Sequence, residues 1–161
     1  MLDAIIRPAV IEDVEALSNI YINMYDTLAS FGMPYRLNEE TVEGVILLQL
    51  KARTCRFFVA ELKGELVGFV VVDVMRMDRK LKYDENNIIA HIKDIYVSPD
   101  IKRLGMATKL LAVAESWAID NGATIIECNV IADNVPAKRF WNSSEYMVLG
   151  QIYYKKLFNK E

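Results

Sequence analysis

Residues 91–111, HIKDIYVSPDIKRLGMATKLL, decide the fold of this chain. The stretch joins a predicted strand over residues 88–97 to a predicted helix over residues 104–121, with a short loop and Gly105 between them. A turn of this kind leaves the N–H groups at the start of the helix unpaired. Because such N–H groups bind anions, and phosphate groups above all, we expect the functional site at this turn.

The composition is that of an ordinary folded protein. Of the 161 residues, 53% are hydrophobic and 25% charged, and only 7 are Gly and 4 Pro, so residues 1–161 are predicted to form one domain. The 19 basic and 22 acidic side chains give a formal net charge of -3. This balance provides no general attraction to nucleic acid or to an anionic membrane, and we expect neither as a partner.

Targeting and redox features point to the cytoplasm. The N-terminus lacks a basic region followed by a long apolar run, and no run approaches the ~18 apolar residues of a membrane span. Cys55 and Cys128 lie in apolar, strand-like segments without CxxC spacing. This usage predicts two free thiols in a reducing compartment, and we expect no metal site.

The N-terminal half of the chain reads as one strand, two helices and a hairpin. A short strand is predicted over residues 4–7 and a loop over residues 26–37. After this loop, Asn38 is predicted to cap a second helix that runs to about Lys51. Between that strand and the loop, apolar residues recur at the spacing of a helix: Val14, Leu17, Tyr21 and Met24. Two strands rich in Phe and Val, over residues 56–62 and 66–75, flank Lys63-Gly64-Glu65 and predict a hairpin.

The second half alternates strands and helices. The charged segment 78–86 is predicted to be a solvated loop, and Asn121-Gly122 ends the helix over residues 104–121. A strand over residues 123–131, a short helix over 136–144, and one or two strands over 146–157 follow. We predict a mixed α/β (α+β) fold, in which about four helices flank a mostly antiparallel sheet of about six or seven strands. A crossover through the long helix makes strands 88–97 and 123–131 a parallel central pair.

Two short motifs follow the two parallel strands. The first is Lys102-Arg103-Leu104-Gly105-Met106-Ala107, and the second places Asn134, Ala137 and Trp141 at fixed spacing. With the element order, these residues resemble the GNAT superfamily of acetyl-CoA-dependent N-acetyltransferases over nearly the whole chain. Gly105 and Ala107 match that family's pyrophosphate loop, whereas Lys102 replaces Gln or Arg and keeps the charge without the planar donor.

The resemblance implies that acetyl-CoA binds as the acyl donor. It implies that backbone N–H groups of residues 103–108 hold the pyrophosphate, and that backbone groups around Ile95 and Val97 bind the pantetheine and polarise the thioester carbonyl. The second motif lies along the other side of the cofactor. The residues expected to bind the cofactor are Ile95, Tyr96, Val97, Lys102, Arg103, Leu104, Gly105, Met106, Ala107, Thr108, Asn134, Ala137, Phe140 and Trp141.

The same resemblance implies that a primary amine attacks the thioester directly. His91 aligns with a glutamate that acts as general base in many relatives, and a pKa near 6.5 suits that role; the alternative is a histidine that makes only a local hydrogen bond. Strand alternation predicts His91, Lys93, Ile95 and Val97 on one face, and Asp94 on the other as a structural or cleft-lining residue.

Trp141 stands where the family often has an acidic tyrosine. An indole cannot protonate the leaving thiolate, but a thiol pKa of roughly 8.5 lets the thiolate leave without strong assistance. The loss of a general acid costs at most ~10²- to 10⁴-fold. Tyr146, Tyr153 and Tyr154 are candidate replacements or simply packing residues, and Cys128 is expected to be an inert buried thiol.

The acceptor is expected opposite the cofactor, between the loop 26–37 and the terminal strands. Tyr25, Phe31 and Tyr35 would form an aromatic wall, and Glu127 would attract the amine of a small molecule, peptide or protein. The alternative is that these aromatic residues only close the core. The sequence leaves a homodimer open.

Two other functions compete with acetyl transfer. Trp141 and Glu145 depart from the family pattern, which leaves room for an acyl-CoA-binding regulatory module with little or no catalysis. A dinucleotide or P-loop fold is the weaker alternative, because the loop lacks both GxGxxG and GxxxxGK[ST].

Overall fold

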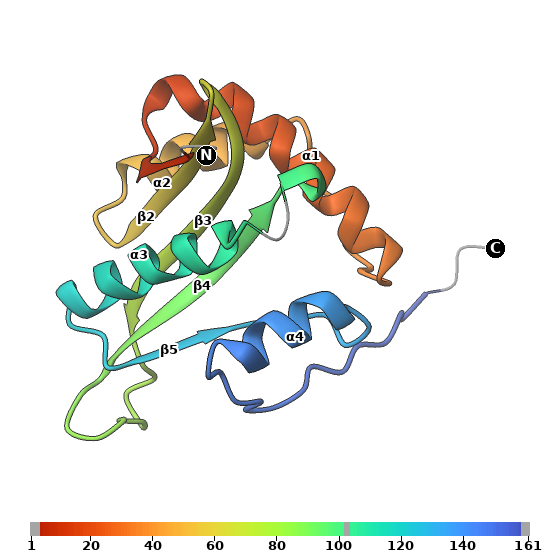
Figure 1. Cartoon of the computed structure of the whole chain (residues 1–161). Coiled ribbons are helices and arrows are strands. Elements are labelled where there is room, and N and C mark those ends of the chain that lie inside the picture. Colours follow the sequence, from red (N-terminus) through yellow and green to blue (C-terminus); the bar gives the residue numbers. More distant parts are fainter. Residues whose placement is uncertain (1–3, 102–103, 159–161) are drawn as a thin grey trace.

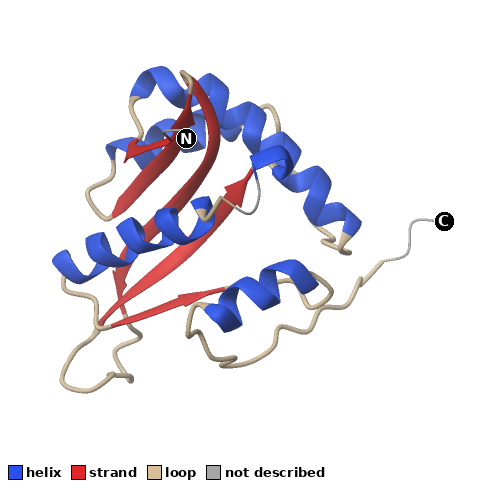
Figure 2. Cartoon of the chain, in the orientation of Figure 1, coloured by secondary structure: helices blue, strands red, loops and turns tan. Residues whose placement is uncertain are grey.

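A mixed five-stranded sheet with helices on both faces forms the protein in the computed structural model, which describes residues 4–101 and 104–158 (Figures 1 and 2). The strands lie in the order in which the chain forms them: β1 (Ala4–Pro8), β2 (Cys55–Leu62), β3 (Glu65–Arg76), β4 (Ile88–Val97) and β5 (Ile125–Cys128). The first four are antiparallel, and β5 runs parallel to β4.

Four α-helices cover the sheet in two layers. They are α1 (Val14–Ser30), α2 (Val42–Lys51), α3 (Met106–Asp120) and α4 (Val135–Ser143), and two short 3₁₀ helices, η1 (Ile11–Asp13) and η2 (Pro99–Ile101), precede α1 and follow β4. Alternation along β3 divides the core: Val70 and Val72 pack toward α3, whereas Phe69 and Val71 pack toward α1 and α2. The predicted mixed α+β fold, its four helices and its parallel strand pair are confirmed.

For several elements, the bounds predicted from local sequence signals agree with the observed bounds to within one or two residues. The hairpin of β2 and β3 turns at Lys63 and Gly64, which both have positive φ, and the loop 78–86 joins β3 to β4 as predicted. Within residues 4–101 and 104–158, no helix is long and apolar enough to span a membrane.

The loop predicted over residues 26–37 begins later than expected. Helix α1 continues to Ser30 and stops just before Gly32, whose φ is 90°. Asn38 does not cap α2, because that helix begins at Val42 after Thr41. The Asn38 side chain instead accepts a hydrogen bond from the Glu40 N–H at 3.2 Å, which closes a turn before the helix.

A β-bulge changes which face of β4 each residue occupies. Val71 of β3 pairs with Asp94 and Val72 pairs with Ile92, so Lys93 is the extra residue. Beyond the bulge Ile95 joins Ile92 on the α3 side, and Asp94 faces α1. The predicted alternation of His91, Lys93, Ile95 and Val97 on one face is therefore wrong after Ile92.

The parallel pair lies at the edge of the sheet and is short. Only residues 89–92 of β4 pair with residues 125–128 of β5, and β4 diverges after the bulge. The predicted strand over 123–131 is therefore too long, and the pair is not central in the described chain. The strands predicted over 146–157 are absent from the described residues, which reduces the sheet from six or seven strands to five. A strand needs a partner edge, and the segment meets none among residues 4–101 and 104–158.

Candidate active site

A cleft of about 610 Å³ opens where β4 continues after β5 has ended. Residues 92–97 of β4 form one wall, and residues 128–131 with part of α4 form the other. The first turn of α3 closes one end, and the C-terminal turns of α1 close the opposite side. The bulge and the shortness of β5 together create this space, because the two strands separate instead of pairing along their full length.

The N-terminus of α3 forms an anion site at one end of the cleft. Gly105 precedes the helix with φ 70° and ψ 16°, and no described side chain caps the first turn. Gly105, Met106, Ala107 and Thr108 line the cleft, and a Cβ on Gly105 would meet no atom within 4 Å. The N–H groups of the first turn have no partner within the helix, and the residues that carry them line the cleft, which fits a pyrophosphate group.

The middle of the cleft is largely apolar. Trp141 is buried and packs edge-on against Phe140, with ring centroids 5.1 Å apart, and against Tyr146 at 4.7 Å. Asn134 begins α4, and its Oδ1 accepts a hydrogen bond from the Ala137 N–H at 3.1 Å. The spacing of Asn134 and Ala137 thus has a structural cause, because the pair forms an N-cap. An apolar channel of this kind suits the pantetheine arm.

Asp94 is a half-buried carboxylate in the wall of this cleft. The Tyr21 hydroxyl of α1 donates a hydrogen bond to Asp94 Oδ2 at 2.8 Å. Burial raises the pKa of Asp94 to about 6, although the Tyr21 hydrogen bond and the charge of Lys93 act in the opposite direction. The carboxylate is consequently a weak base that is mostly ionised at neutral pH.

His91 and Glu127 lie on the neighbouring part of the sheet. His91 of β4 pairs with Asp73 of β3 and with Glu127 of β5. The Lys93 ammonium contacts Asp73 Oδ2 at 3.3 Å, and this ion pair stands beside His91. Neither His91 nor Glu127 is among the residues that line the cleft.

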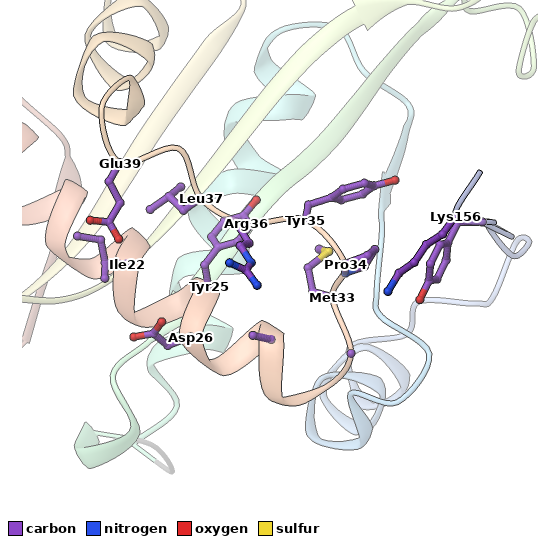
Figure 3. Close-up of a pocket in the computed structure, with 13 residues that line it drawn as sticks. Ile22, Tyr25, Asp26, Met33, Pro34, Tyr35, Arg36, Leu37, Glu39 and Lys156 are labelled. Carbon is purple, nitrogen blue, oxygen red and sulfur yellow. The ribbon is translucent and has the colours of Figure 1, made fainter. Parts of the chain in front are cut away.

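A second pocket of about 600 Å³ adjoins the cleft (Figure 3). Residues of α1 and the loop 32–39 line one side, and Lys156 of the C-terminal segment 146–158 lines the other. Tyr154 of the same segment also lines the pocket. Tyr25 and Met33 line both cavities, so the two spaces meet at these side chains. Charged groups of both signs also line the pocket: Asp26, Arg36, Glu39 and Lys156.

The two cavities collect most of the residues predicted from sequence. Leu104 is exposed and lines neither cavity, and Lys102 and Arg103 lie outside the described residues. Phe31 lines the cleft and Tyr35 the second pocket. The cofactor residues that line the cleft are Ile95, Tyr96, Val97, Gly105, Met106, Ala107, Thr108, Asn134, Ala137, Phe140 and Trp141.

Sequence reasoning missed the pairing of Tyr21 with Asp94. The sequence pattern marks Tyr21 only as an apolar position of a helix, and Asp94 only as a structural or cleft-lining residue. A carboxylate in the apolar strand IIAHIKDIYV was the available signal, since a buried charge requires a partner. The partner itself lies 73 residues away in sequence and could not be read from local spacing.

The candidate acids and the cleft cysteine also have defined surroundings. The Tyr146 hydroxyl donates to Glu115 Oε1 at 2.9 Å, and burial with this contact raises the pKa of Tyr146 above its usual range. Tyr153 donates to Gln151 at the surface. Cys128 is half-buried and lines the cleft, contrary to the expected full burial, and burial raises the pKa of its thiol to about 11. A thiol with that pKa is protonated at neutral pH.

Comparisons with known proteins agree with this geometry. The model of the acetyltransferase (GNAT) family matches residues 15–145. An uncharacterized N-acetyltransferase of Archaeoglobus fulgidus is 25% identical over 140 residues, which are 87% of this chain and 90% of the relative. An uncharacterized N-acetyltransferase of Methanocaldococcus jannaschii is 27% identical over 84% of this chain but only 57% of its own length.

A solved structure shares the fold at low sequence identity. Aminoglycoside N-acetyltransferase AAC(6')-Iy in complex with CoA superposes with a TM-score of 0.79 and 17% identity. The match covers 98% of this chain and 97% of the solved one. The arrangement of sheet, cleft and helices described above is thus that of a known three-dimensional fold.

Proposed function

The chain belongs to the acetyltransferase (GNAT) family and is an acetyl-CoA-dependent acyltransferase, and we propose that it acetylates the primary amine of a polar small molecule. One observation carries the proposal: Tyr25 and Met33 line both the second pocket and the cleft, and the cleft also holds Asp94 and the anion site at α3. A donor and an acceptor that enter from opposite ends would meet beside that carboxylate.

The donor end is assigned to acetyl-CoA. The free N–H groups after Gly105 would hold the pyrophosphate, and residues 95–97, which β5 no longer covers, would offer backbone hydrogen bonds to the pantetheine. Support comes from the AAC(6')-Iy structure, which shares the fold and was solved with CoA. The lost strand pairing of β4 is what makes its backbone available to a ligand.

The acceptor end is assigned to the second pocket. Tyr25 and Tyr35 supply aromatic faces, and Asp26 and Glu39 supply carboxylates that attract an ammonium group. Arg36 and Lys156 add positive charge, so the pocket suits an acceptor with several polar groups. The solved aminoglycoside acetyltransferase gives independent support for a small polar amine as the acceptor.

The acceptor must lose a proton before it attacks, because a primary amine is protonated at neutral pH. Asp94 is ionised there and lines the cleft, so it can take the proton directly or through one water. His91 stays a prediction from the resemblance, and its place beside Asp73 and Glu127 makes it the competing base. The geometry favours Asp94.

We assign no side chain as the general acid that would protonate the leaving thiolate. Trp141 cannot donate a useful proton, and the Tyr146 hydroxyl is held by Glu115, with a pKa raised above the usual range. A CoA thiolate leaves readily at neutral pH without help. Of the three candidate tyrosines, only Tyr154 lines a cavity, and that cavity is the acceptor pocket.

The test is a measurement of CoA thiol release with a panel of amines, including aminoglycosides, polyamines and lysine peptides. We expect acceptor-dependent turnover that rises with pH through about 6, the pKa of Asp94, as the carboxylate ionises. In Asp94→Asn, kcat should fall at least about 100-fold with little change in the acetyl-CoA Kd. Asp26→Asn removes a carboxylate of the acceptor pocket instead, and should raise the acceptor KM.

Two outcomes would change the assignment. If His91→Ala loses turnover while Asp94→Asn retains it, the base is His91. If acetyl-CoA binds tightly and no amine in the panel gives turnover, the acyl-CoA-binding module replaces the enzyme as the better account.

A further inference from the structure

Tyr21 lies midway along α1, on the side of the helix that packs on the sheet. It is 6% exposed and lines neither the cleft nor the second pocket, so a ligand in either space would not touch it. Its hydroxyl nevertheless reaches the cleft wall, where it donates to Asp94 Oδ2 at 2.8 Å. A buried tyrosine hydroxyl requires a hydrogen-bond partner, and here that partner is the carboxylate to which the proposed reaction assigns a proton.

The core beneath α1 holds the Tyr21 ring in place. Its centroid lies 4.8 Å from that of Phe69, and Phe57 packs on Phe69 in turn, with centroids 6.2 Å apart. Leu17 and Met24, one turn before and after Tyr21 on the same helix, are buried as well. A ring packed in this way cannot change rotamer without opening the core. The hydroxyl is therefore a donor at a fixed position.

The hydrogen bond divides the two carboxylate oxygens of Asp94 between two tasks. Oδ2 accepts from Tyr21, whereas Oδ1 has no hydrogen-bond partner among the described residues. Because Asp94 lines the cleft, Oδ1 is the oxygen left to accept a proton from a ligand there. A general base whose second atom is held by another group is the arrangement that keeps a base correctly oriented.

We propose that Tyr21 is a positioning residue, whose hydroxyl fixes the Asp94 carboxylate so that Oδ1 accepts the proton of the acceptor amine. The inference rests on the proposed function, in which Asp94 is the base. In the step itself an N–H bond of the ammonium breaks, its electron pair stays on nitrogen, and the proton moves to Oδ1. Tyr21 keeps its own proton throughout, because burial raises the pKa of its hydroxyl above the usual range.

The other groups around Asp94 do not replace this contact. Among the described residues, Tyr21 alone donates a hydrogen bond to the carboxylate. Lys93 is its neighbour in β4, but the Lys93 ammonium contacts Asp73 Oδ2 at 3.3 Å. Burial raises the pKa of the Cys55 thiol to about 11, so this thiol is neutral at pH 7. The titratable and charged groups around the carboxylate are Tyr21 and Tyr25 of α1, Cys55 of β2, Asp73 of β3 and Lys93 of β4.

The test is Tyr21→Phe, which keeps the ring and removes only the hydroxyl. Carboxyl-carbon NMR of the full chain with labelled aspartate follows the titration of Asp94 without any substrate, and Asp94→Asn identifies its resonance. The pKa of Asp94 should be about 6 in wild type and about 7 in Tyr21→Phe, because the ionised carboxylate loses its donor. The matched control Phe57→Leu changes the same buried core without removing the hydrogen bond, so the Asp94 pKa should stay about 6.

Release of CoA thiol with an active amine of the panel gives a second readout. In Tyr21→Phe the pH midpoint of kcat should rise together with the pKa of Asp94. At pH 8, where the carboxylate is ionised in both proteins, kcat should still be about 10-fold lower, because its orientation is no longer fixed. The acetyl-CoA Kd should not change, since Tyr21 lines neither cavity. Phe57→Leu should keep the pH midpoint of wild type.

The two readouts separate failure of this inference from failure of the proposed function. If Tyr21→Phe leaves the pKa of Asp94 unchanged, or if Phe57→Leu raises it equally, the Tyr21 hydroxyl does not position the carboxylate, whichever residue is the base. If the pKa rises as expected while kcat and its pH midpoint stay those of wild type, Asp94 is not the base. The role of Tyr21 in the reaction is then overturned together with the proposed mechanism.

Discussion

The sheet of β1–β4 and the C-terminal part of the chain, from β5 onward, differ in how far their apolar side chains are buried. Phe69, Val70 and Val72 of β3 are 0% exposed, whereas Tyr153 and Phe158 of the C-terminal segment are each 87% exposed. The first region completes its core with its own helices on both faces. The second has a four-residue strand and a segment without backbone partners. The first region therefore completes its core within one chain, whereas the second leaves apolar side chains uncovered.

The active-site cleft lies on the boundary between these regions. The bulge at Lys93 turns β4 away from β5, and the early end of β5 leaves residues 93–97 without a neighbour on that side. The first region thus supplies Asp94 and the β4 backbone, while the second supplies α4 and part of the second pocket. A ligand in the cleft replaces contacts that a longer β5 would have made.

The largest expected effect on stability comes from a comparison of one Phe→Ala substitution in each region. Phe69→Ala should lower the free energy of unfolding by about 3 to 5 kcal/mol, because it leaves a cavity beside Tyr21 and Phe57. Phe158→Ala should change it by less than about 0.5 kcal/mol, because that side chain is exposed. Urea unfolding at low protein concentration measures both. Equal losses would mean that the C-terminal segment is part of the core.

A second pair of variants separates ligand contacts from backbone strain. Gly105→Ala should weaken acetyl-CoA binding about 10- to 100-fold, because its methyl group enters the open space before α3 and φ 70° disfavours any side chain. Gly64→Ala in the β2–β3 turn, with φ 81° and the same open surroundings, should lower stability similarly and leave binding unchanged. Isothermal titration calorimetry decides this, and equal weakening in both variants would remove the anion site from α3.

The same boundary divides what the sequence could reveal from what it could not. Strand β4 and the β2–β3 hairpin are bounded by local signals, the charged loop before Ile88 and the turn at Lys63 and Gly64, so they were predicted closely. The bulge at Lys93 depends on the register of two strands, which no local spacing encodes. The strands predicted over 146–157 failed because strand propensity needs an edge to pair with.

The candidate site follows the same division. The residues of the turn at Gly105 and of the helix after Asn134 lie close together in sequence, so their places in the cleft were predictable. Asp94 gains its chemistry from Tyr21, which is distant in sequence and reaches it only after folding. His91 was favoured because of its residue type and alignment, and no local signal could show that it lies outside the cleft wall.

Asp94→Asn tests whether the buried carboxylate of Asp94 lowers the free energy of unfolding. The pKa of Asp94 rises from 3.8 to about 6 on folding, so the folded state binds the proton more tightly. The unfolding free energy of wild type should therefore fall as pH rises from about 4 to about 6, and the cost persists above that window. At pH 8 the variant should be more stable by about 3 kcal/mol, and at pH 3 the two should be equal. A difference that does not vary with pH would contradict this cause.

The smallest effect concerns a strained residue at the end of α4. Glu145 has φ 66°, a left-handed conformation that favours glycine, and the Tyr146 N–H after it donates to the Trp141 carbonyl at 3.1 Å. Glu145→Gly should raise the free energy of unfolding by about 1 kcal/mol, as measured by thermal denaturation. Ser144→Gly, at φ -96°, should lower it, because glycine relieves no strain there, adds freedom to the unfolded chain, and removes the hydrogen bond that the Ser144 hydroxyl donates to the Phe140 carbonyl at 2.8 Å. If both variants raise the free energy of unfolding equally, relief of backbone strain at Glu145 is not the cause of the gain.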